Sequence, residues 1–225
     1  MPNFNYTVDV MADKAKNKLI SIVMIDTIKL CGNTIFNPLT NSDIYSNNTP
    51  LFANTTDQAL AAMYWVDLEN KLKAISATKV PYIIVSGHFP VYSVAEHGST
   101  KCLIKNLVPL LHKYKVSAYL SGHDHNLQHL SYSDWGSTVE YFVVGANALN
   151  SYSVDNADTV PSGSLKYQWP KSKDYVNGGF LMVQANAANM TMNFVKSSPK
   201  FGLPIPKFGY TTSILYTKTI LPRRV

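Results

Sequence analysis

The sequence predicts an α/β domain in which helices connect parallel strands. Two apolar runs, residues 19–26 and 82–85, are rich in β-branched residues and predict buried strands. The second run is almost continuously apolar, as strands of parallel sheets are. A helical pattern at residues 103–114 separates it from a third strand at 116–120. A strand, a helix and a strand within about 40 residues form a βαβ unit, so these two strands are expected to be parallel.

The elements before and within this unit follow from the same patterns. Residues 33–56 are rich in Asn, Thr, Ser and Pro and predict a surface loop. Thr55 or Thr56 can cap a helix that runs from about Asp57 to Ile75. Its apolar residues fall on one face, which predicts a core contact: Leu60, Tyr64, Leu68, Leu72 and Ile75. A loop is predicted over residues 88–100.

After residue 126 the pattern changes to hairpins. Residues 127–132 and 139–144 flank a turn at Ser133–Gly136, and residues 179–184 and 190–195 flank a second turn. The long polar stretch 146–177 predicts either a functional loop or poor order. A last strand is expected near residues 211–216.

Composition indicates an ordinary globular chain. The 225 residues, 46% hydrophobic and 15% charged, fit one domain over residues 1–225. There is no apolar run of about 18 residues, so we expect no transmembrane helix. The net charge is +6 and the pI about 9.1, but the lysines are scattered. We therefore expect a solvated basic surface and no nucleic-acid partner.

The cysteines and the glycosylation sequons indicate in which cellular compartment the protein is expected. Cys31 and Cys102 are either free thiols or a disulfide, which would close a loop of about 70 residues. Four N-glycosylation sequons favour a secretory route; they begin at Asn5, Asn47, Asn54 and Asn189. Residues 1–18 lack the apolar core of a signal peptide. This conflict suggests a chain that is missing its own beginning.

The candidate functional residues are histidines placed just after two of the predicted strands. His88 follows residues 82–85, and His123 and His125 follow residues 116–120. Because the carboxyl ends of parallel strands lie at one edge of a sheet, these imidazoles are expected to converge on a metal. In an extended segment His123 and His125 would point to the same side, and Asp124 would point away and orient the loop. The other two histidines considered, His112 and His129, have no such context and are predicted to be structural or surface residues.

The segments around these histidines resemble those of a known protein family. Val85-Ser86-Gly87-His88-Phe89-Pro90, continuing to Glu96-His97-Gly98, is similar to the tartrate-resistant (type 5) purple acid phosphatases, which are metallophosphoesterases. The segment Leu120-Ser121-Gly122-His123-Asp124-His125-Asn126-Leu127-Gln128 resembles them equally. Shorter agreements occur at residues 30–33, 102–105, 178–180 and 221–224. The resemblance is to the C-terminal portion of that family, whose fold is a four-layer α/β/β/α sandwich.

The resemblance implies a role for each matched residue. His88 and His123 would bind a divalent metal, His125 a ferric ion, and His97 would contact the substrate phosphate and assist proton transfer. Cys31 and Cys102 match a disulfide pair. The implied enzyme is an acid phosphatase of the secretory route or lysosome, with an Fe–Fe or Fe–Zn centre. A metal-bound hydroxide would hydrolyse phosphate monoesters there. We expect the protein to be monomeric.

The acidic ligands of that family have no match in this sequence. The chain contains no Gly-Asp dipeptide, and Thr34 follows Gly32-Asn33 where an asparagine motif requires histidine. Neither Asp26, Asp124 nor Asp134 has the context of a replacement. We therefore expect the isolated chain to bind one metal weakly and to be inactive or impaired. We also expect it to expose an apolar sheet face or edge.

Three interpretations remain open. The first is part of a genuine acid phosphatase. The second is a non-catalytic secreted glycoprotein that retains the phosphatase scaffold as a binding module. The third, a polyanion binder, rests on net charge alone.

Overall fold

The structure of this chain is a computed structural model, and it describes residues 5–12, 17–31, 34–37, 42–45, 55–146, 150–174, 176–200 and 209–223. Residues 34–37, 42–45 and 55–58 are described by their backbone alone.

A seven-stranded mixed sheet forms the centre of the molecule. Its strands lie in the order β1-β2-β5-β6-β8-β7-β9, with β2, β5, β6 and β8 parallel to one another and the other pairs antiparallel. Their bounds are β1 Tyr6–Met11, β2 Lys18–Met24, β5 Tyr82–Ser86, β6 Ala118–Ser121, β7 Leu127–Asp134, β8 Ser137–Val144 and β9 Leu165–Trp169.

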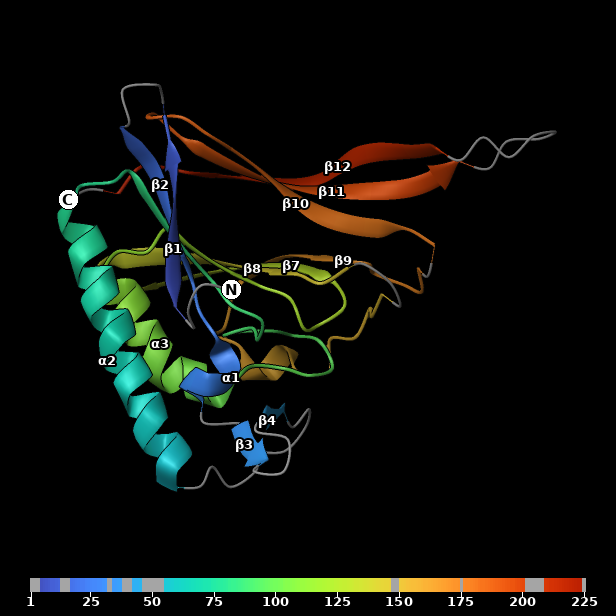
Figure 1. The fold of residues 1–225 in the computed structure, drawn as a ribbon. Helices are drawn as coiled ribbons and strands as arrows, with labels where there is room; N and C mark the ends of the chain where they lie inside the picture. The colour runs from blue at the N-terminus through green and yellow to red at the C-terminus, as the bar shows by residue number, and fades with distance from the viewer. Residues whose placement is uncertain are drawn as a thin grey trace.

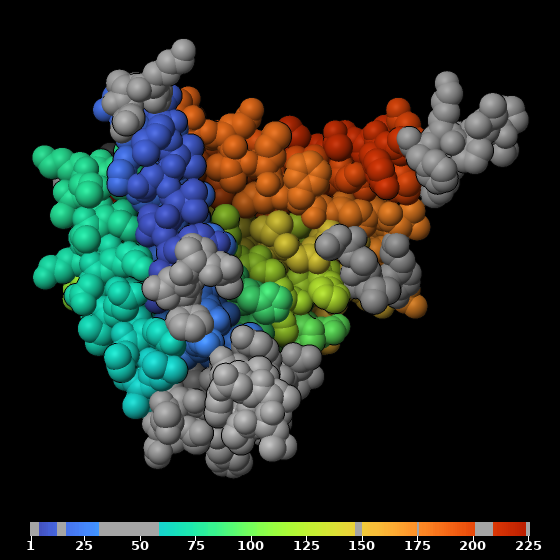
Figure 2. Space-filling view, in the orientation of Figure 1, coloured from blue at the N-terminus to red at the C-terminus, as the bar shows by residue number. Residues whose placement is uncertain are grey.

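The two faces of this sheet are covered differently (Figure 1). Helices α1 (Thr27–Leu30), α2 (Thr55–Ala77) and α3 (Lys101–Lys113) pack on one face. A second antiparallel sheet packs on the other, made of β10 (Gly178–Ala185), β11 (Met190–Lys200) and β12 (Gly209–Ile220). Its orange and red strands lie along β7–β9 in Figure 2. In the described part of the chain, no helix covers the outer face of this second sheet.

Strand alternation divides the apolar side chains between two cores. In β5, Ile83 and Val85 face the helices, where they join Leu68 of α2 and Leu107 of α3. Tyr82 and Ile84 face the second sheet instead, where they join a cluster that includes Phe194. The almost continuous hydrophobicity of the central strands follows from this burial on both sides.

Most of the predicted elements are confirmed. The strands at 19–26, 82–85 and 116–120 are present as β2, β5 and β6, and β5 pairs with β6 in parallel. The helices are α2 and α3, and both predicted hairpins form. The last strand is β12, which is longer than predicted. On α2, Leu68 and Leu72 are fully buried, whereas Leu60 at the start of the stripe is exposed.

Two predictions of irregular structure need correction. Residues 33–56 were predicted to be a loop, but β3 (Thr34–Asn37) and β4 (Ser42–Tyr45) form an antiparallel hairpin there. The polar stretch 146–177 contains β9 and the short 3₁₀ helix η1 (Ala157–Thr159). Residues 6–11, for which no element was predicted, form β1, which borders β2. The first hairpin turn is also shorter than predicted, because Asp134 already pairs with Ser137.

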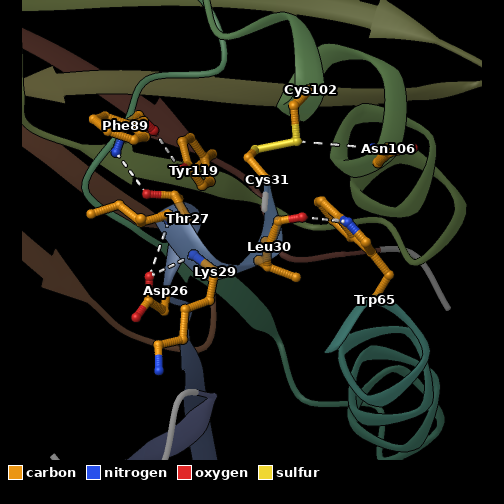
Figure 3. The surroundings of a disulfide bond; sticks show 11 residues. Asp26, Thr27, Lys29, Leu30, Cys31, Trp65, Phe89, Cys102, Asn106 and Tyr119 are labelled. Atoms are coloured by element: carbon orange, nitrogen blue, oxygen red, sulfur yellow. Dashed lines mark hydrogen bonds between the residues drawn. A yellow bond between two sulfur atoms is a disulfide. The ribbon is translucent and has the colours of Figure 1, made fainter. Parts of the chain in front are cut away.

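A disulfide and a short helix hold the edge of the sheet where the histidines lie. Cys31, which follows α1, is bonded to Cys102 of α3, so the pairing implied by the resemblance is present (Figure 3). Oδ1 of Asp26 caps α1 by accepting from the backbone N–H groups of Ile28 and Lys29 at 3.0 and 3.1 Å. Asp26 is therefore a structural residue.

A buried polar cluster connects the two sheets. His129 of β7 is completely buried; its Nε2 lies 2.8 Å from Oε2 of Glu140 on β8, and its Nδ1 lies 2.8 Å from the hydroxyl of Tyr216 on β12. Nζ of Lys218 on β12 lies 2.8 Å from Oε1 of Glu140. His129 is thus a structural residue, as predicted, and so is the buried His112 of α3, whose Nδ1 lies 3.0 Å from Oγ of Ser137.

The expected apolar edge is present on β1, the outermost strand of the central sheet. Val8, Val10 and Met11 are all more than one-third exposed. Such an edge can pair with another strand and favours aggregation. Among the described helices, none combines the length and hydrophobicity required to cross a membrane.

Replacing both cysteines, C31A together with C102A, should lower the free energy of unfolding by about 4 kcal/mol. The bridge joins residues 71 positions apart, and closing a loop of that length restricts the unfolded chain. Urea unfolding measures the difference. A reductant should bring the native protein to the midpoint of the variant and leave the variant unchanged; equal stability of the two proteins would contradict the prediction.

Candidate functional site

The site lies at the carboxyl ends of β5 and β6. The ladder pairs Ser86 with Leu120, and it continues past the strand ends because the backbone N–H of Gly122 donates to the carbonyl of His88 at 3.0 Å. His88 therefore lies directly beside the segment that carries His123. The structure confirms the predicted convergence of these two histidines, which the parallel pairing enforces.

Two ring nitrogens meet at this edge. Nδ1 of His123 lies 3.2 Å from Nε2 of His88. Two nitrogen ligands of one tetrahedral ion, each at 2.0–2.1 Å from the metal, lie about 3.3 Å apart. The spacing of His88 and His123 is therefore that of two ligands of a single ion.

His97 and Phe89 complete the surroundings of His123. The ring centroids of His97 and His123 are 4.5 Å apart, and those of Phe89 and His123 are 4.7 Å apart in a T-shaped arrangement. Nε2 of His97 also lies 3.7 Å from Oε1 of Glu96. His97 is exposed to solvent, as a group that meets a substrate must be.

The segment 122–126 is not extended, and this corrects the sequence-based expectation. The N–H of Asp124 donates to the carbonyl of Gly122, and the N–H of Asn126 donates to that of Asp124, both at 2.8 Å. His123 and His125 each occupy the centre of a three-residue γ-turn. His123 has a φ of +66°, which is costly for a residue with a side chain.

Asp124, which lies between the two histidines in the sequence, was predicted to point away from them and orient the loop, and its contacts are those of a loop-orienting residue. Its side chain is completely buried, Oδ1 accepts from the backbone N–H of His97 at 3.1 Å, and Oδ2 accepts from the hydroxyl of Ser93. Burial raises the pKa of Asp124 above its usual value, although these two hydrogen bonds oppose the shift. Asp124 is therefore a residue that organises the loop and is not directed at a metal.

Desolvation keeps the two converging imidazoles neutral. Burial lowers the pKa of His123 to about 4, and the neighbouring His97, His88 and His125 add to this effect. Burial also lowers the pKa of His88. A neutral imidazole is the form that binds metals, so His123 stays competent as a ligand in mildly acidic solution.

The ligand set of the described residues is incomplete for a binuclear centre. No group of three or more His, Cys, Asp or Glu side chains in the described ranges is arranged to hold a metal ion. His125 is exposed, and its carbonyl accepts from the N–H of Ser151 at 2.8 Å. The structure thus brings His88, His123 and His97 together, and among the described residues it forms no complete metal-binding group with them.

Sequence reasoning missed the residues that support the site. Ser93, Gln128 and Asn156 hydrogen-bond the backbone around His97. Ser93 and Gln128 stand inside the two motif segments, so a search for buried polar residues there could have found them. Gly145 is also essential, because a Cβ at this position would lie 2.0 Å from the carbonyl oxygen of Asp124.

The predicted glycosylation residues have mixed placements. Asn5 is buried, and its Nδ2 donates to Oδ2 of Asp67 at 3.4 Å, so a glycan there requires this contact to open. Asn189 is half-buried in the turn between β10 and β11. Asn47 and Asn54 lie outside the described residues. Modification at all four remains a prediction.

Comparison with known proteins identifies relatives in sequence. The family model of calcineurin-like phosphoesterases matches residues 3–127. The chain is 38% identical to tartrate-resistant acid phosphatase type 5 of Mus musculus and 35% identical to that of Homo sapiens. Each alignment spans 184 residues, which cover 82% of this chain and 51% of the relative. It is 36% identical to purple acid phosphatase 17 of Arabidopsis thaliana over 46% of this chain and 29% of that protein. The chain spans about half the length of the type 5 relatives it matches.

Two solved structures share the fold. GAP50 of Plasmodium, the anchor in the inner membrane complex, matches with a TM-score of 0.63 and 22% identity over 100% of this chain and 56% of that one. A purple acid phosphatase from yellow lupin seeds matches with a TM-score of 0.52 and 16% identity over 86% of this chain and 31% of that one. At these identities the likeness concerns the fold.

Substituting Gly145 should disturb the histidine segment. G145A places a methyl group where the carbonyl oxygen of Asp124 lies, and forced overpacking of this kind costs about 1–3 kcal/mol. The matched control is G122A, because the nearest atom to a Cβ there is 4.0 Å away. Thermal unfolding should show a loss for G145A and a change within about 0.5 kcal/mol for G122A. Equal effects of the two would argue against the close approach.

Proposed function

We propose that this chain, which belongs to the calcineurin-like phosphoesterase family, supplies the histidine side of an acid phosphatase active site that hydrolyses phosphate monoesters. The observation that carries the proposal is the 3.2 Å spacing of the His88 and His123 ring nitrogens, with the His97 ring beside them. The 38% identity to a type 5 acid phosphatase supports the same substrate class.

His88 and His123 would hold one divalent ion, and His125 would hold a second ion, which we propose to be iron with Fe or Zn as its partner. Such a centre, when bound, activates water and holds the phosphate oxygens. Imidazole nitrogen suits both Fe and Zn. The second ion also needs oxygen ligands, and the described residues hold no group of three or more side chains that would complete its site.

The chain's own residues would bind and orient the substrate. His97 is exposed within contact distance of His123, so its ring can hydrogen-bond a phosphate oxygen or give a proton to the leaving group. Oε1 of Glu96 lies 3.7 Å from Nε2 of His97. Phe89 shields one side of His123 from water.

A secretory or lysosomal location is part of the same proposal. The Cys31–Cys102 disulfide supports it, since disulfides form and persist mainly in oxidising compartments. The four sequons support it as well. We propose that the protein acts as a monomer and takes no nucleic acid.

A non-catalytic binding module is the second candidate. It is favoured by the absence, among the described residues, of any group of three metal-binding side chains. The scaffold, the disulfide and the His97 loop would then serve recognition of a phosphate-bearing partner.

Histidine variants separate metal binding from catalysis. H123A and H88A should each weaken Zn²⁺ binding by more than about 10-fold. Removing a residue that only hydrogen-bonds a metal ligand already costs about that much, and removing a ligand itself should cost more. H97N should retain the metal and lower turnover of p-nitrophenyl phosphate at pH 5 by about 10²–10⁴-fold, because it removes a proton-transfer group. Titration calorimetry and steady-state kinetics make the two measurements.

The wild-type chain is the reference for both candidates. Because this chain alone is expected to be inactive or impaired, a lack of turnover does not separate the two candidates, whereas turnover that H97N lowers would exclude the non-catalytic binding module. Full metal affinity in both H88A and H123A would rule out the proposed ligands.

A further inference from the structure

We propose that Asp124 is a positioning residue that fixes His97 against the metal-binding histidines, through hydrogen bonds to the segment Ser93–His97, called here the His97 loop. The proposal rests on the proposed function, in which His97 meets the substrate. Asp124 would thereby connect the segment that carries His123 and His125 to the imidazole of His97, which faces the substrate.

Both carboxylate oxygens of Asp124 are directed at the His97 loop. Oδ1 accepts from the N–H of His97 at 3.1 Å, and Oδ2 accepts from the hydroxyl of Ser93. The two contacts lie four residues apart, at the two ends of the loop. One side chain therefore sets the position of the whole loop relative to the peptide that carries His123 and His125.

The hydroxyl of Ser93 extends this connection. It accepts from the N–H of Ala95 at 3.1 Å and from Nε2 of Gln128 at 2.8 Å, while it donates to Asp124. Oε1 of Gln128 accepts from the N–H of Val94 at 2.9 Å. The N–H groups of Val94, Ala95 and His97 thus all donate to side chains of one buried network.

The opposite side of the His97 loop is held by Asn156. Its Nδ2 donates to the carbonyl of Ala95 at 2.6 Å, and its backbone N–H donates to the carbonyl of Val94 at 3.0 Å. Ser93, Val94 and Ala95 are buried, whereas the side chains of Glu96 and His97 are exposed. The network leaves the loop little freedom apart from these two side chains.

A carboxylate is required at position 124 because both of its partners donate. The hydrogen-bond partners are a hydroxyl and an amide, so these two bonds offset part of the cost of burying the carboxylate. An asparagine could accept only one of the two bonds. Its Nδ2 would face either the N–H of His97 or the Ser93 oxygen, which already accepts two hydrogen bonds.

The first test needs no catalysis. In the full chain, D124N should accelerate hydrogen exchange at the His97 amide by about 10-fold or more, because a bond to a charged acceptor is lost. The matched control is D67N, since Asp67 is exposed on α2 and its contacts are with Asn5 and Lys71, outside this network. S93A is the second variant. It removes the hydroxyl that bonds Asp124, so it should accelerate the same exchange while every residue of the segment 123–125 stays unchanged. Unchanged exchange at His97 in S93A, or in a folded D124N, would overturn the proposal.

The second test asks whether Asp124 acts through His97. D124N should lower the kcat for p-nitrophenyl phosphate by on the order of 10-fold or more in the native background. In an H97A background it should change kcat by less than about 2-fold, with the bound Zn²⁺ unchanged. An equal loss in both backgrounds would mean that Asp124 supports the ligand segment only, and would overturn the positioning role. If the native chain shows no turnover, as is expected of a chain whose described residues lack a complete ligand set, the exchange experiment alone decides the proposal.

Discussion

The parallel pairing of β5 with β6 is the constraint on which the histidine edge depends. Because both strands run in the same direction, both end at the same edge, and the 31 residues between them must cross over through α3. The pairing is buried between two cores, so its register is fixed by Ile83 and Val85 on one face and by Tyr82 and Ile84 on the other. His88 and His123 are consequently brought together by packing that neither residue takes part in.

The sequence predicts the central elements well because their patterns are strong. Continuous apolar runs mark β2 and β5, and two histidine motifs follow β5 and β6 at the turn after each strand. It fails for β1 and β9, which lie at the two borders of the sheet. A border strand is partly exposed, so its composition is closer to that of a loop, and tertiary pairing supplies what local propensity does not.

The conformation of the histidine segment could not be predicted from spacing. An i, i+2 spacing suggests an extended chain, whereas consecutive γ-turns produce the observed arrangement through a left-handed His123. The strain of that residue is offset by contacts that are far apart in the sequence, among them Gly145 and Ser93. Long-range contacts of this kind leave no periodic signal.

Two histidines contribute to stability in different ways. The folded state lowers the pKa of His123 from its usual 6.5 to about 4, so the unfolded chain binds the proton first, and the free energy of unfolding decreases as the pH falls from about 6.5 toward 4. His129 instead connects the two sheets, because its Nε2 lies 2.8 Å from Glu140 of the central sheet and its Nδ1 lies 2.8 Å from the hydroxyl of Tyr216 on the second sheet. A carboxylate can accept and a hydroxyl can donate or accept, so both ring nitrogens find a partner. One imidazole ring thereby acts as a cross-link between the two layers.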